Sequence, residues 1–182
     1  MLDLHALLLA KLEKQKADLL FEIGTWPLAK VRYQPSPREW SALQILDHLL
    51  KTEVAIMEAA RKGLVQPHRI GLTDRLRTRF LHRVFQSDRR VKVPASASQV
   101  LPGSDPDLPT MIEQWQKSRG ALQHLAQNVT EEQQTKGILK HPMGGWMGLS
   151  DILDFFSVHL THHSYQLARL QEAFRTSPLE KN

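Results

Sequence analysis

Four long segments in which apolar residues recur every three or four positions constrain the fold of this chain more than any other feature. This spacing places apolar side chains on one face of an α-helix, and each such face must pack against another element. The segments cover about residues 2–24, 42–62, 107–128 and 151–175. Strand patterns are weak and allow at most a short hairpin around 137–148. An all-α fold in one domain, residues 1–182, is therefore predicted, and four helices of this length favour a four-helix bundle.

Residues with capping preferences mark the ends of these helices. Ser41 precedes the second segment, and Gln44 follows it by three residues, which is the spacing of a capping box. Glycines end the first two segments. Ser150 is expected to cap the fourth helix, with Asp151 near the positive end of the helix dipole. These signals predict well-defined starts for the second and fourth helices.

The stretch between the second and third long helices is predicted to contain a short helix and a long loop. Apolar residues four positions apart indicate the short helix: Leu72, Leu76, Phe80 and Val84. The following segment, VKVPASASQVLPGSDPD, has three prolines and several small polar residues, which disfavour a helix. It is predicted to be an ordered loop over the helices, because its apolar side chains would otherwise be exposed. These side chains are Val91, Val93, Val100 and Leu101.

The positive charge is concentrated in the same region. The chain has a formal net charge of +5, and residues 61–92 hold ten Lys and Arg residues against two acids. A solvated helix face is the preferred interpretation. The alternatives are attraction of an anionic substrate or a carboxylate-bearing thiol cofactor, and contact with nucleic acid or an acidic membrane surface. No helix-turn-helix, zinc-finger or RNA-binding signature is present, so a nucleic-acid partner is not expected.

The absence of cysteine limits both the chemistry and the compartment. It excludes disulfides, thiolate metal ligands and a cysteine nucleophile. The first residues, MLDLHALLLAKLEK, contain an early acid and an early return of charge, unlike a signal peptide. No stretch approaches the roughly 18 apolar residues of a membrane span. A cytoplasmic protein without membrane partners is therefore expected.

Two histidines in the fourth segment have the spacing of a metal site. His159 and His163 are four residues apart, so they lie on one helix face. Other residues continue this face as a stripe that should point inward: Ile152, Phe156, Gln166 and Leu170. Two imidazoles at this spacing can hold one ion. His162 falls off the stripe and is expected to be exposed.

A third ligand must come from another helix, and His48 is the best candidate. It lies in the segment WSALQILDHLLKTEVAI, in line with apolar residues that predict a buried face. His48 could instead be a core histidine hydrogen-bonded to a backbone carbonyl, and His159 and His163 could be satisfied by other hydrogen bonds or half exposed. Four others lie in polar or basic surroundings and are expected at the surface: His5, His68, His82 and His124. His141, which precedes Pro142 in a turn, stays open as a candidate.

Three stretches of the sequence resemble the DinB-like family, also called the DinB/YfiT-like metalloenzymes. They are WSALQILDHLLKTE, VKVPASASQVLPG and HPMGGWMGLSDILDFFSVHLTHHSYQL, and the resemblance covers nearly the whole chain. The family pattern of one histidine on the second helix and His-x-x-x-His on the fourth matches His48, His159 and His163. The resemblance implies an up-down-down-up four-helix bundle, often a homodimer, that binds zinc, nickel or a similar divalent ion.

Three neutral ligands would leave at least one position of the ion open, as in catalytic rather than structural sites. Activation of water there gives hydrolysis, and activation of a thiol gives transfer of a low-molecular-weight thiol to an electrophile. The resembled family includes thiol S-transferases and a thiol-dependent isomerase. The leading hypothesis is therefore a metal-dependent thiol transferase or hydrolase that acts on a small molecule. The alternative is a non-enzymatic metal-binding protein with a stress-response or interaction role.

No catalytic base is evident in the sequence. Gln166 could hydrogen-bond a ligand histidine or a metal-bound water, or simply lie at the edge of its stripe. Glu53, five residues beyond His48, could support that histidine, although a solvated surface acid is the preferred interpretation. Three tryptophans could wall a pocket or belong to the ordinary core: Trp40, Trp115 and Trp146.

Overall fold

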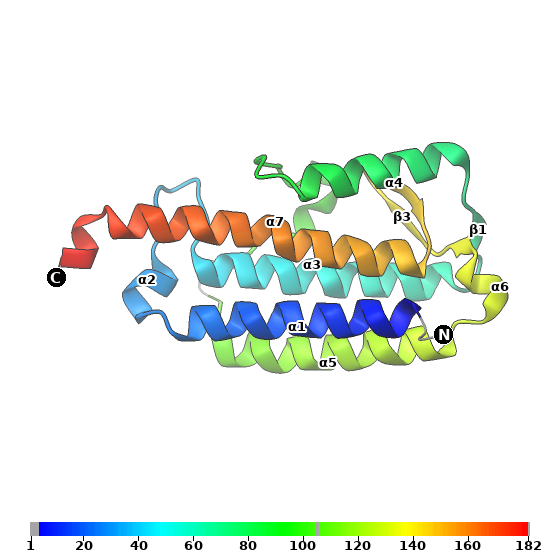
Figure 1. The fold of residues 1–182 in the computed structure, drawn as a ribbon, viewed down its shortest axis with the longest axis horizontal. Coiled ribbons are helices and arrows are strands. Elements are labelled where there is room, and N and C mark those ends of the chain that lie inside the picture. The colour runs from blue at the N-terminus through cyan, green and yellow to red at the C-terminus, as the bar shows by residue number, and fades with distance from the viewer. Residues whose placement is uncertain (1–3, 105, 182) are drawn as a thin grey trace.

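Four long helices form the main body of the structure, a computed structural model that describes residues 4–104 and 106–181. They are α1 (Leu4–Gly24), α3 (Ala42–Gly63), α5 (Leu108–Asn128) and α7 (Leu149–Arg175). They lie side by side along the long axis of the molecule, and α3 and α5 run opposite to α1 and α7 (Figure 1). The predicted segments agree with these bounds to within two residues, although residues 2 and 3 lie outside the described part. The all-α prediction is confirmed.

The shorter elements lie in the connections. The short helices are α2 (Leu28–Arg32), α4 (Leu72–Phe85) and α6 (Glu131–Gln134), with 3₁₀ helices η1 (Ala95–Val100) and η2 (Pro178–Lys181). β1 (His68–Arg69) pairs antiparallel with β2 (Lys136–Gly137), and β3 (Leu139–His141) with β4 (Gly145–Met147). The predicted short helix is confirmed as α4, and the predicted hairpin as β3 with β4. The sequence patterns did not predict α2 or the β1–β2 pair.

Capping interactions determine where α3 and α7 begin. The predicted capping box of α3 is present. Gln44 donates its main-chain N–H to Ser41 Oγ at 3.3 Å, and Ser41 donates its main-chain N–H to Gln44 Oε1 at 3.0 Å. The expected Ser150 cap of α7 is wrong, because Gly148 precedes the first helical residue and donates its N–H to the Asp151 carboxylate at 3.0 Å. Asp151 reaches back from the third helical position and satisfies an N–H that the helix leaves unpaired.

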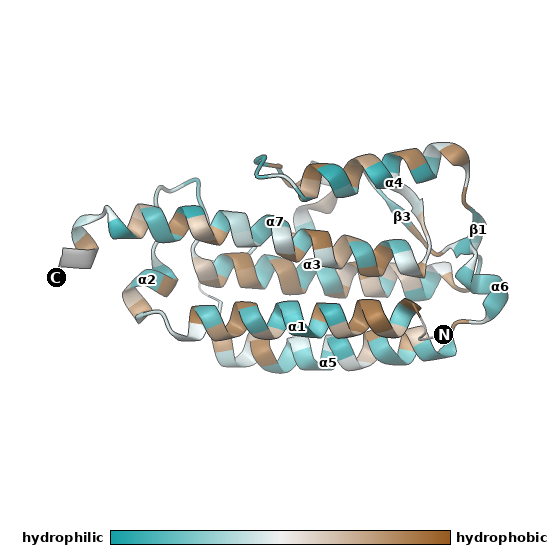
Figure 2. Ribbon diagram, viewed as in Figure 1, coloured by the Kyte–Doolittle hydropathy of each residue, from teal (hydrophilic) through white to brown (hydrophobic). Residues whose placement is uncertain are grey.

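The core lies between the long helices, and α7 contacts two of the other three. α7 packs against α1, α3 and α4, and α3 also packs against α5. Hydrophobic and hydrophilic residues alternate along each long helix (Figure 2), as expected of helices with one buried face. The largest fully buried side chains include Leu12, Ile23, Ile45, Leu46, Leu81, Trp115, Leu122, Leu149, Ile152 and Leu153. No helix in the described part of the chain is long and apolar enough to cross a membrane.

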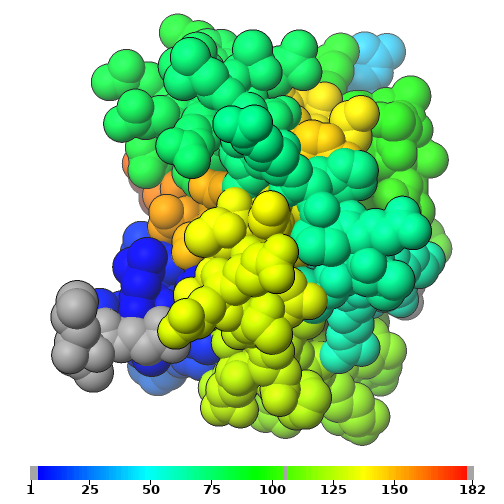
Figure 3. All heavy atoms as spheres, turned by 90° about the vertical axis from the view of Figure 1, so that its right-hand side faces the viewer, coloured from blue at the N-terminus to red at the C-terminus, as the bar shows by residue number. Residues whose placement is uncertain are grey.

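α4 lies outside the group of four long helices and packs against one of them, α7, and against the β3–β4 hairpin (Figure 1). Its buried residues are Thr78, Leu81 and Phe85. The apolar stripe that predicted this helix faces solvent instead: Leu72, Leu76 and Phe80 are 74%, 57% and 70% exposed. In the end-on view (Figure 3), the start of α4 lies above the segment from α6 to β3, which crosses the ends of the long helices.

Contacts with α4 fix the position of the β3–β4 hairpin. Thr78 Oγ1 donates to the Gly144 carbonyl at 2.9 Å, and Trp146 donates its main-chain N–H to Asp74 Oδ1 at 3.1 Å. Gly145 has a φ of 75°, and a Cβ there would lie 2.5 Å from Asp74 Oδ1. Glycine adopts this positive φ without strain, and it has no Cβ to clash with Asp74. The hairpin is therefore held in one place relative to α4.

The loop after α4 lies over α3, as predicted. η1 packs on α3, and Val100 is 7% exposed, whereas Leu101 is 46% exposed and does not follow the prediction. Asp47 on α3 fastens the loop by accepting the main-chain N–H of Gly103 at 2.6 Å. One residue of the predicted loop, Asp105, lies outside the described residues. This anchoring brings the main chain at Val100 onto the middle of α3.

Candidate metal centre

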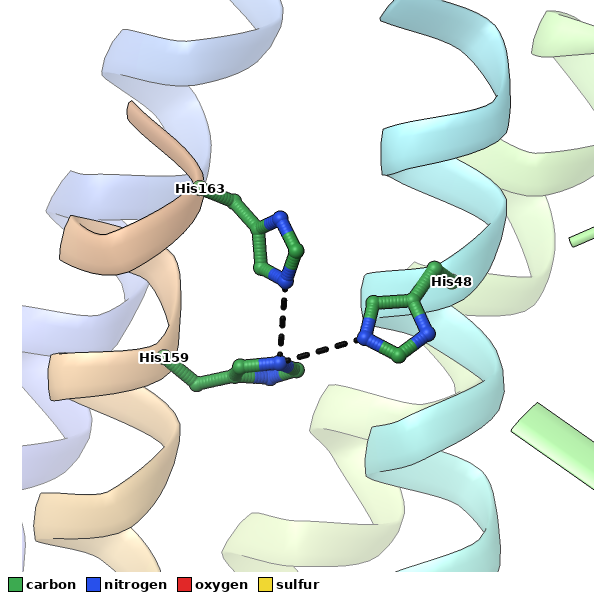
Figure 4. Close-up of side chains that lie close together, drawn as sticks. All are labelled: His48, His159 and His163. Carbon is green, nitrogen blue, oxygen red and sulfur yellow. Dashed lines mark hydrogen bonds between the residues drawn. The ribbon is translucent and has the colours of Figure 1, made fainter. Parts of the chain in front are cut away.

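Three histidines from two helices converge at one point between α3 and α7 (Figure 4). His159 Nε2 lies 3.1 Å from His163 Nε2 and 3.3 Å from His48 Nε2. All three are buried, with 4–5% of each residue exposed. Among the described residues, they form the one group of His, Asp and Glu side chains close enough together to hold a metal ion. The convergence predicted from helical spacing and from the stripe around His48 is present.

Hydrogen bonds fix the tautomer of two of these rings. His48 Nδ1 donates to the main-chain carbonyl of Val100 at 2.8 Å, and His163 Nδ1 donates to Gln166 Oε1 at 2.8 Å. A neutral imidazole carries one proton, so a ring that donates from Nδ1 has a lone pair on Nε2. The Nε2 atoms of His48 and His163 are therefore presented toward His159 as ligand atoms. Gln166 hydrogen-bonds a histidine of the cluster, which is one of the two roles considered for it.

Burial keeps the cluster uncharged. Loss of hydration lowers the pKa of His48, and lowers the pKa values of His159 and His163 well below the usual 6.5, because a buried imidazolium is poorly solvated. Repulsion from the neighbouring rings lowers the pKa values of His159 and His163 further. Neutral imidazole is the form that binds metal ions. The cluster can therefore bind an ion at neutral pH without first losing protons.

The donor set fits a divalent ion. Imidazole nitrogens bind zinc at about 2.0–2.1 Å, and tetrahedral geometry at that distance puts neighbouring ligand atoms about 3.3 Å apart. The two Nε2 separations, 3.1 and 3.3 Å, match this spacing. Hydrogen bonding alone explains the contacts less well, because His159 can donate from Nε2 to only one neighbour, and the Nε2 atoms of His48 and His163 have no proton to give.

Aromatic side chains surround the cluster. Phe155 stacks on His159 with ring centroids 5.3 Å apart and planes 16° apart, and Phe85 lies 5.5 Å from His159. Trp40 lies against His48, with centroids 4.8 Å apart. These rings limit the rotation of the imidazoles and shield their outer faces from water. Of the three tryptophans considered as pocket walls, Trp40 is the one at the cluster.

A cavity of about 710 Å³ opens beside the three histidines, which form part of its wall. Residues of α3, α7, the β3–β4 hairpin, the loop before α3 and the loop after α4 form most of the rest of the wall. The volume suits a small molecule. Five basic side chains and one acid line the cavity: Arg38, Arg90, Lys92, Lys140 and Arg169, with Glu39. Arg90 pairs with Glu39 at 3.3 Å and Arg169 pairs with Asp88, so the wall keeps a positive balance.

The basic segment 61–92 divides between two environments. The arginines of α4 are exposed, as expected of a solvated helix face: Arg75, Arg77, Arg79 and Arg83. Arg90 and Lys92, at the end of the segment, line the cavity instead. Part of the excess positive charge therefore lies where a ligand of the histidine cluster would bind.

Glu53 faces α5 and not the histidine cluster. It is 3% exposed, and its carboxylate accepts hydrogen bonds from Trp115 Nε1 at 3.0 Å and Ser118 Oγ at 2.9 Å. It also pairs with Arg119, which is 4% exposed, at 3.0 Å. The expectation of a solvated surface acid is wrong, because α5 carries polar partners on its buried face. The support of His48 that was considered for Glu53 comes instead from the main-chain carbonyl of Val100 in η1, which no sequence pattern indicated.

Two histidines expected at the surface are buried. His162 is 5% exposed, because α4 packs against α7 and places the Phe85 ring 5.1 Å from the His162 ring. His5 is 4% exposed, and its Nε2 lies 3.0 Å from Ser150 Oγ. The periodicity of one helix does not report what a different helix covers. The other three are half-buried or exposed: His82 is half-buried, and His68 and His124 are exposed.

The chain resembles a known protein family over the region that contains the histidine cluster. A sequence model of the DinB superfamily matches residues 11–167. The matched range contains all three histidines of the cluster and most of the described chain, and it confirms the resemblance seen in the sequence. No curated protein and no solved structure matches the chain.

Proposed function

Because the chain belongs to the DinB superfamily, we propose that it is a metal-dependent enzyme that acts on a small molecule. The observation that carries the proposal is the opening of the three-histidine cluster into a cavity of about 710 Å³. His48, His159 and His163 would hold a divalent ion through Nε2, and no Asp, Glu or further His among the described residues joins the group. Three protein ligands beside a cavity are typical of catalytic metal sites, whereas structural sites have four.

The surrounding residues orient the ligands and shape the site. Val100 and Gln166 hold two rings in the tautomer whose Nε2 lone pair faces the ion. Phe155 and Trp40 shield the outer faces of the rings. A bound divalent ion supplies Lewis-acid activation of a water or a thiol. The cavity wall positions the substrate beside the cluster, and its positive balance attracts anions.

Two reaction classes use this chemistry: transfer of a low-molecular-weight thiol to an electrophile, and hydrolysis. The chain contains no cysteine, so any thiol in the reaction must come from a co-substrate. Zinc and nickel are the proposed ions, because imidazole ligands suit both. Both classes need access of a second molecule to the cluster, which the cavity provides.

A non-enzymatic metal-binding protein is the alternative function. A fourth protein ligand, or an ion covered by side chains, would favour that alternative. The three-membered group and the adjoining cavity support the enzymatic proposal instead.

The test measures both reactions in parallel on protein loaded with zinc or with nickel. Several cellular thiols are offered with an alkyl halide as electrophile, and a set of esters and amides is offered for hydrolysis. We expect turnover of one class in the parent and in His124→Ala, whose exposed histidine lies outside the cluster. His159→Ala should lose that turnover. Stoichiometric metal with no turnover above the His159→Ala background would contradict the enzymatic proposal.

A further inference from the structure

The turn of the β3–β4 hairpin holds the ring of His141 in a single tautomer. His141 Nδ1 accepts the main-chain N–H of Met143 at 3.2 Å and that of Gly144 at 3.0 Å. Because a main-chain N–H can only donate, Nδ1 must be unprotonated, and the proton of the neutral ring lies on Nε2. This tautomer is opposite to that of His48 and His163. His141 therefore presents an N–H donor where the cluster presents lone pairs.

His141 belongs to the wall of the same cavity. Its ring packs against Phe155 with centroids 4.9 Å apart, and Phe155 in turn stacks on His159 at 5.3 Å. The ring of Phe155 therefore contacts both His141 and a histidine of the cluster. Within the described part of the chain, the hydrogen bonds of His141 are the two at Nδ1, which leaves Nε2–H available to a ligand.

The donor is neutral and held in place before a ligand arrives. Burial, together with the nearby His82, lowers the pKa of His141 to about 4, so the ring is uncharged at neutral pH. The hairpin is fixed to α4 through the hydrogen bonds of Thr78 and Asp74. A donor that needs no rearrangement contributes its full hydrogen bond to the ligand.

The charges of the cavity indicate what kind of acceptor this donor meets. Arg90 and Arg169 are paired with acids. The other basic residues of the wall form no ion pair with another described residue: Arg38, Lys92 and Lys140. Lys140 lies next to His141 on β3, but its ammonium nitrogen is 5.9 Å from the centre of the Trp146 ring. Arg38 and Lys92 therefore supply the unpaired charge of the wall. These charges favour an anionic oxygen over a neutral carbonyl as the partner of His141 Nε2–H.

We propose that the β3–β4 hairpin forms an oxyanion-binding subsite of this cavity, in which His141 Nε2–H donates a hydrogen bond to a carboxylate of the molecule bound at the histidine cluster. The inference rests on the proposed function, because it takes the cluster as the place where the other end of that molecule binds. The basic side chains attract the anion over a distance, and the single tautomer of His141 gives the contact a direction.

The subsite is tested with pairs of thiols that carry either a carboxylate or a hydroxyl at the end away from the sulfur. The protein is loaded with Co²⁺, and binding of 3-mercaptopropionate and of 3-mercapto-1-propanol is followed by the thiolate-to-cobalt absorption band. Mercaptoacetate and 2-mercaptoethanol form a second pair with a shorter chain. In the pair whose length fits, we expect the carboxylate to bind at least about tenfold more tightly than the alcohol, the effect of one hydrogen bond to a charged group.

Substitutions of His141 separate the hydrogen bond from the general attraction of the basic wall. His141→Phe keeps an aromatic ring against Phe155 and removes the donor, so the preference should fall to about twofold or less. His141→Gln returns a neutral N–H donor and should recover part of the preference. His68→Phe is the matched control, because His68 is an exposed histidine stacked on Trp146 of the same hairpin and is not part of the cavity wall.

A measurement on the unsubstituted protein guards against variants that misfold. Imidazole ¹⁵N NMR of the zinc-loaded protein should show His141 with its proton on Nε2 between about pH 5 and 8. The Nε2–H resonance should move when 3-mercaptopropionate is added and stay in place with 3-mercapto-1-propanol. A proton on Nδ1, or an Nε2–H resonance that moves with neither ligand, would overturn the subsite.

The outcomes distinguish the subsite from the proposed function beneath it. If both thiols bind the cobalt protein with equal affinity, or if His141→Phe keeps the carboxylate preference, the subsite is wrong and the open metal site stands. If neither thiol changes the cobalt spectrum, the cluster does not bind a thiol, and thiol transfer fails as the proposed function together with the subsite.

Discussion

The Nδ1 atom of His48 lies 2.8 Å from the main-chain carbonyl oxygen of Val100. Through this bond, the loop after α4 sets the tautomer of a side chain on α3 that lies 52 residues earlier in the sequence. Asp47 fastens the same loop to α3 by accepting the N–H of Gly103 at 2.6 Å. The cluster therefore depends on groups that are not ligands, and changes to such groups should alter it.

Replacement of Gln166 tests how far a hydrogen-bond partner tunes the site. Gln166→Leu removes the acceptor of His163 Nδ1–H, and we expect the affinity for zinc to fall by about 10- to 100-fold. Gln166→Glu keeps an acceptor in the same place and should bind zinc at least as tightly as the parent. Competition with a chromophoric chelator measures both. Equal zinc affinities for Gln166→Leu and the parent would contradict the role given to Gln166.

Acid should destabilise the metal-free protein through its buried histidines. Burial lowers the pKa of His141 to about 4, and it also lowers the pKa values of His48, His159 and His163. Below about pH 6.5 the unfolded chain binds protons that the folded chain does not, so stability is complete above that pH and falls as the pH drops. Urea unfolding of the metal-free protein at a series of pH values measures the loss.

The contribution of His141 to this acid sensitivity can be measured separately. Between about pH 6.5 and 4, His141→Phe should make the fall in unfolding free energy shallower by up to about 1.4 kcal/mol per pH unit, the effect of one proton. His124→Phe, at an exposed position, should leave the slope unchanged. If His141→Phe has the slope of the parent, the ring is not held neutral in the folded state.

The buried pair of Glu53 and Arg119 should stabilise the fold without affecting the ion. Burial raises the pKa of Glu53, while Arg119 and the hydrogen bonds from α5 lower it. Glu53→Gln leaves a buried guanidinium without its closest carboxylate, and we expect the free energy of unfolding to fall by about 3 to 5 kcal/mol. Glu113→Gln breaks an exposed pair with Lys117 and should cost about 1 kcal/mol or less.

Urea unfolding compares these two variants, and elemental analysis follows their zinc content. Folded Glu53→Gln should keep the zinc content of the parent, because Glu53 contacts α5 and not the cluster. A stability loss in Glu53→Gln no larger than that in Glu113→Gln would show that the pair does not stabilise the core.

Two glycine-to-alanine substitutions should change stability in opposite directions. Gly145 has a φ of 75° and a Cβ there would lie 2.5 Å from Asp74 Oδ1, so Gly145→Ala should destabilise the protein by about 1 to 3 kcal/mol. A Cβ at Gly120, within α5, would meet nothing within 4 Å, so Gly120→Ala should stabilise by about 0.5 to 1 kcal/mol. Chemical denaturation measures both, and an unchanged Gly145→Ala would remove the steric argument for the hairpin.

Local signals in the sequence predict the helices, whereas tertiary packing decides which face of a helix is covered. Periodicity and the capping box of α3 act over a few residues, which is why they predict the bounds of the long helices. Neither signal reports what lies against a helix. On α4, the regular apolar stripe faces solvent, whereas Thr78 and Phe85 pack inward. His162 is buried for the same reason, since α4 covers a face of α7 that the sequence pattern of α7 marks as polar.

The candidate ligands were predictable and the groups around them were not. His159 and His163 share a helix face, which follows from spacing alone, and His48 lies on a visibly apolar stripe. The carbonyl that orients His48 and the turn that holds His141 come from contacts that leave no residue-type signal, because main-chain groups make them. Sequence patterns report side chains, so main-chain partners need the fold.

The metal content of single-site variants tests the three-histidine centre most directly. After exposure to zinc and dialysis, the parent protein should hold about one ion per chain by elemental analysis. His48→Ala, His159→Ala and His163→Ala should each lose the ion while they keep a helical circular dichroism spectrum. His162→Ala is the matched control and should keep it, because His162 is buried on α7 but outside the cluster. One ion per chain in all three ligand variants would contradict the site.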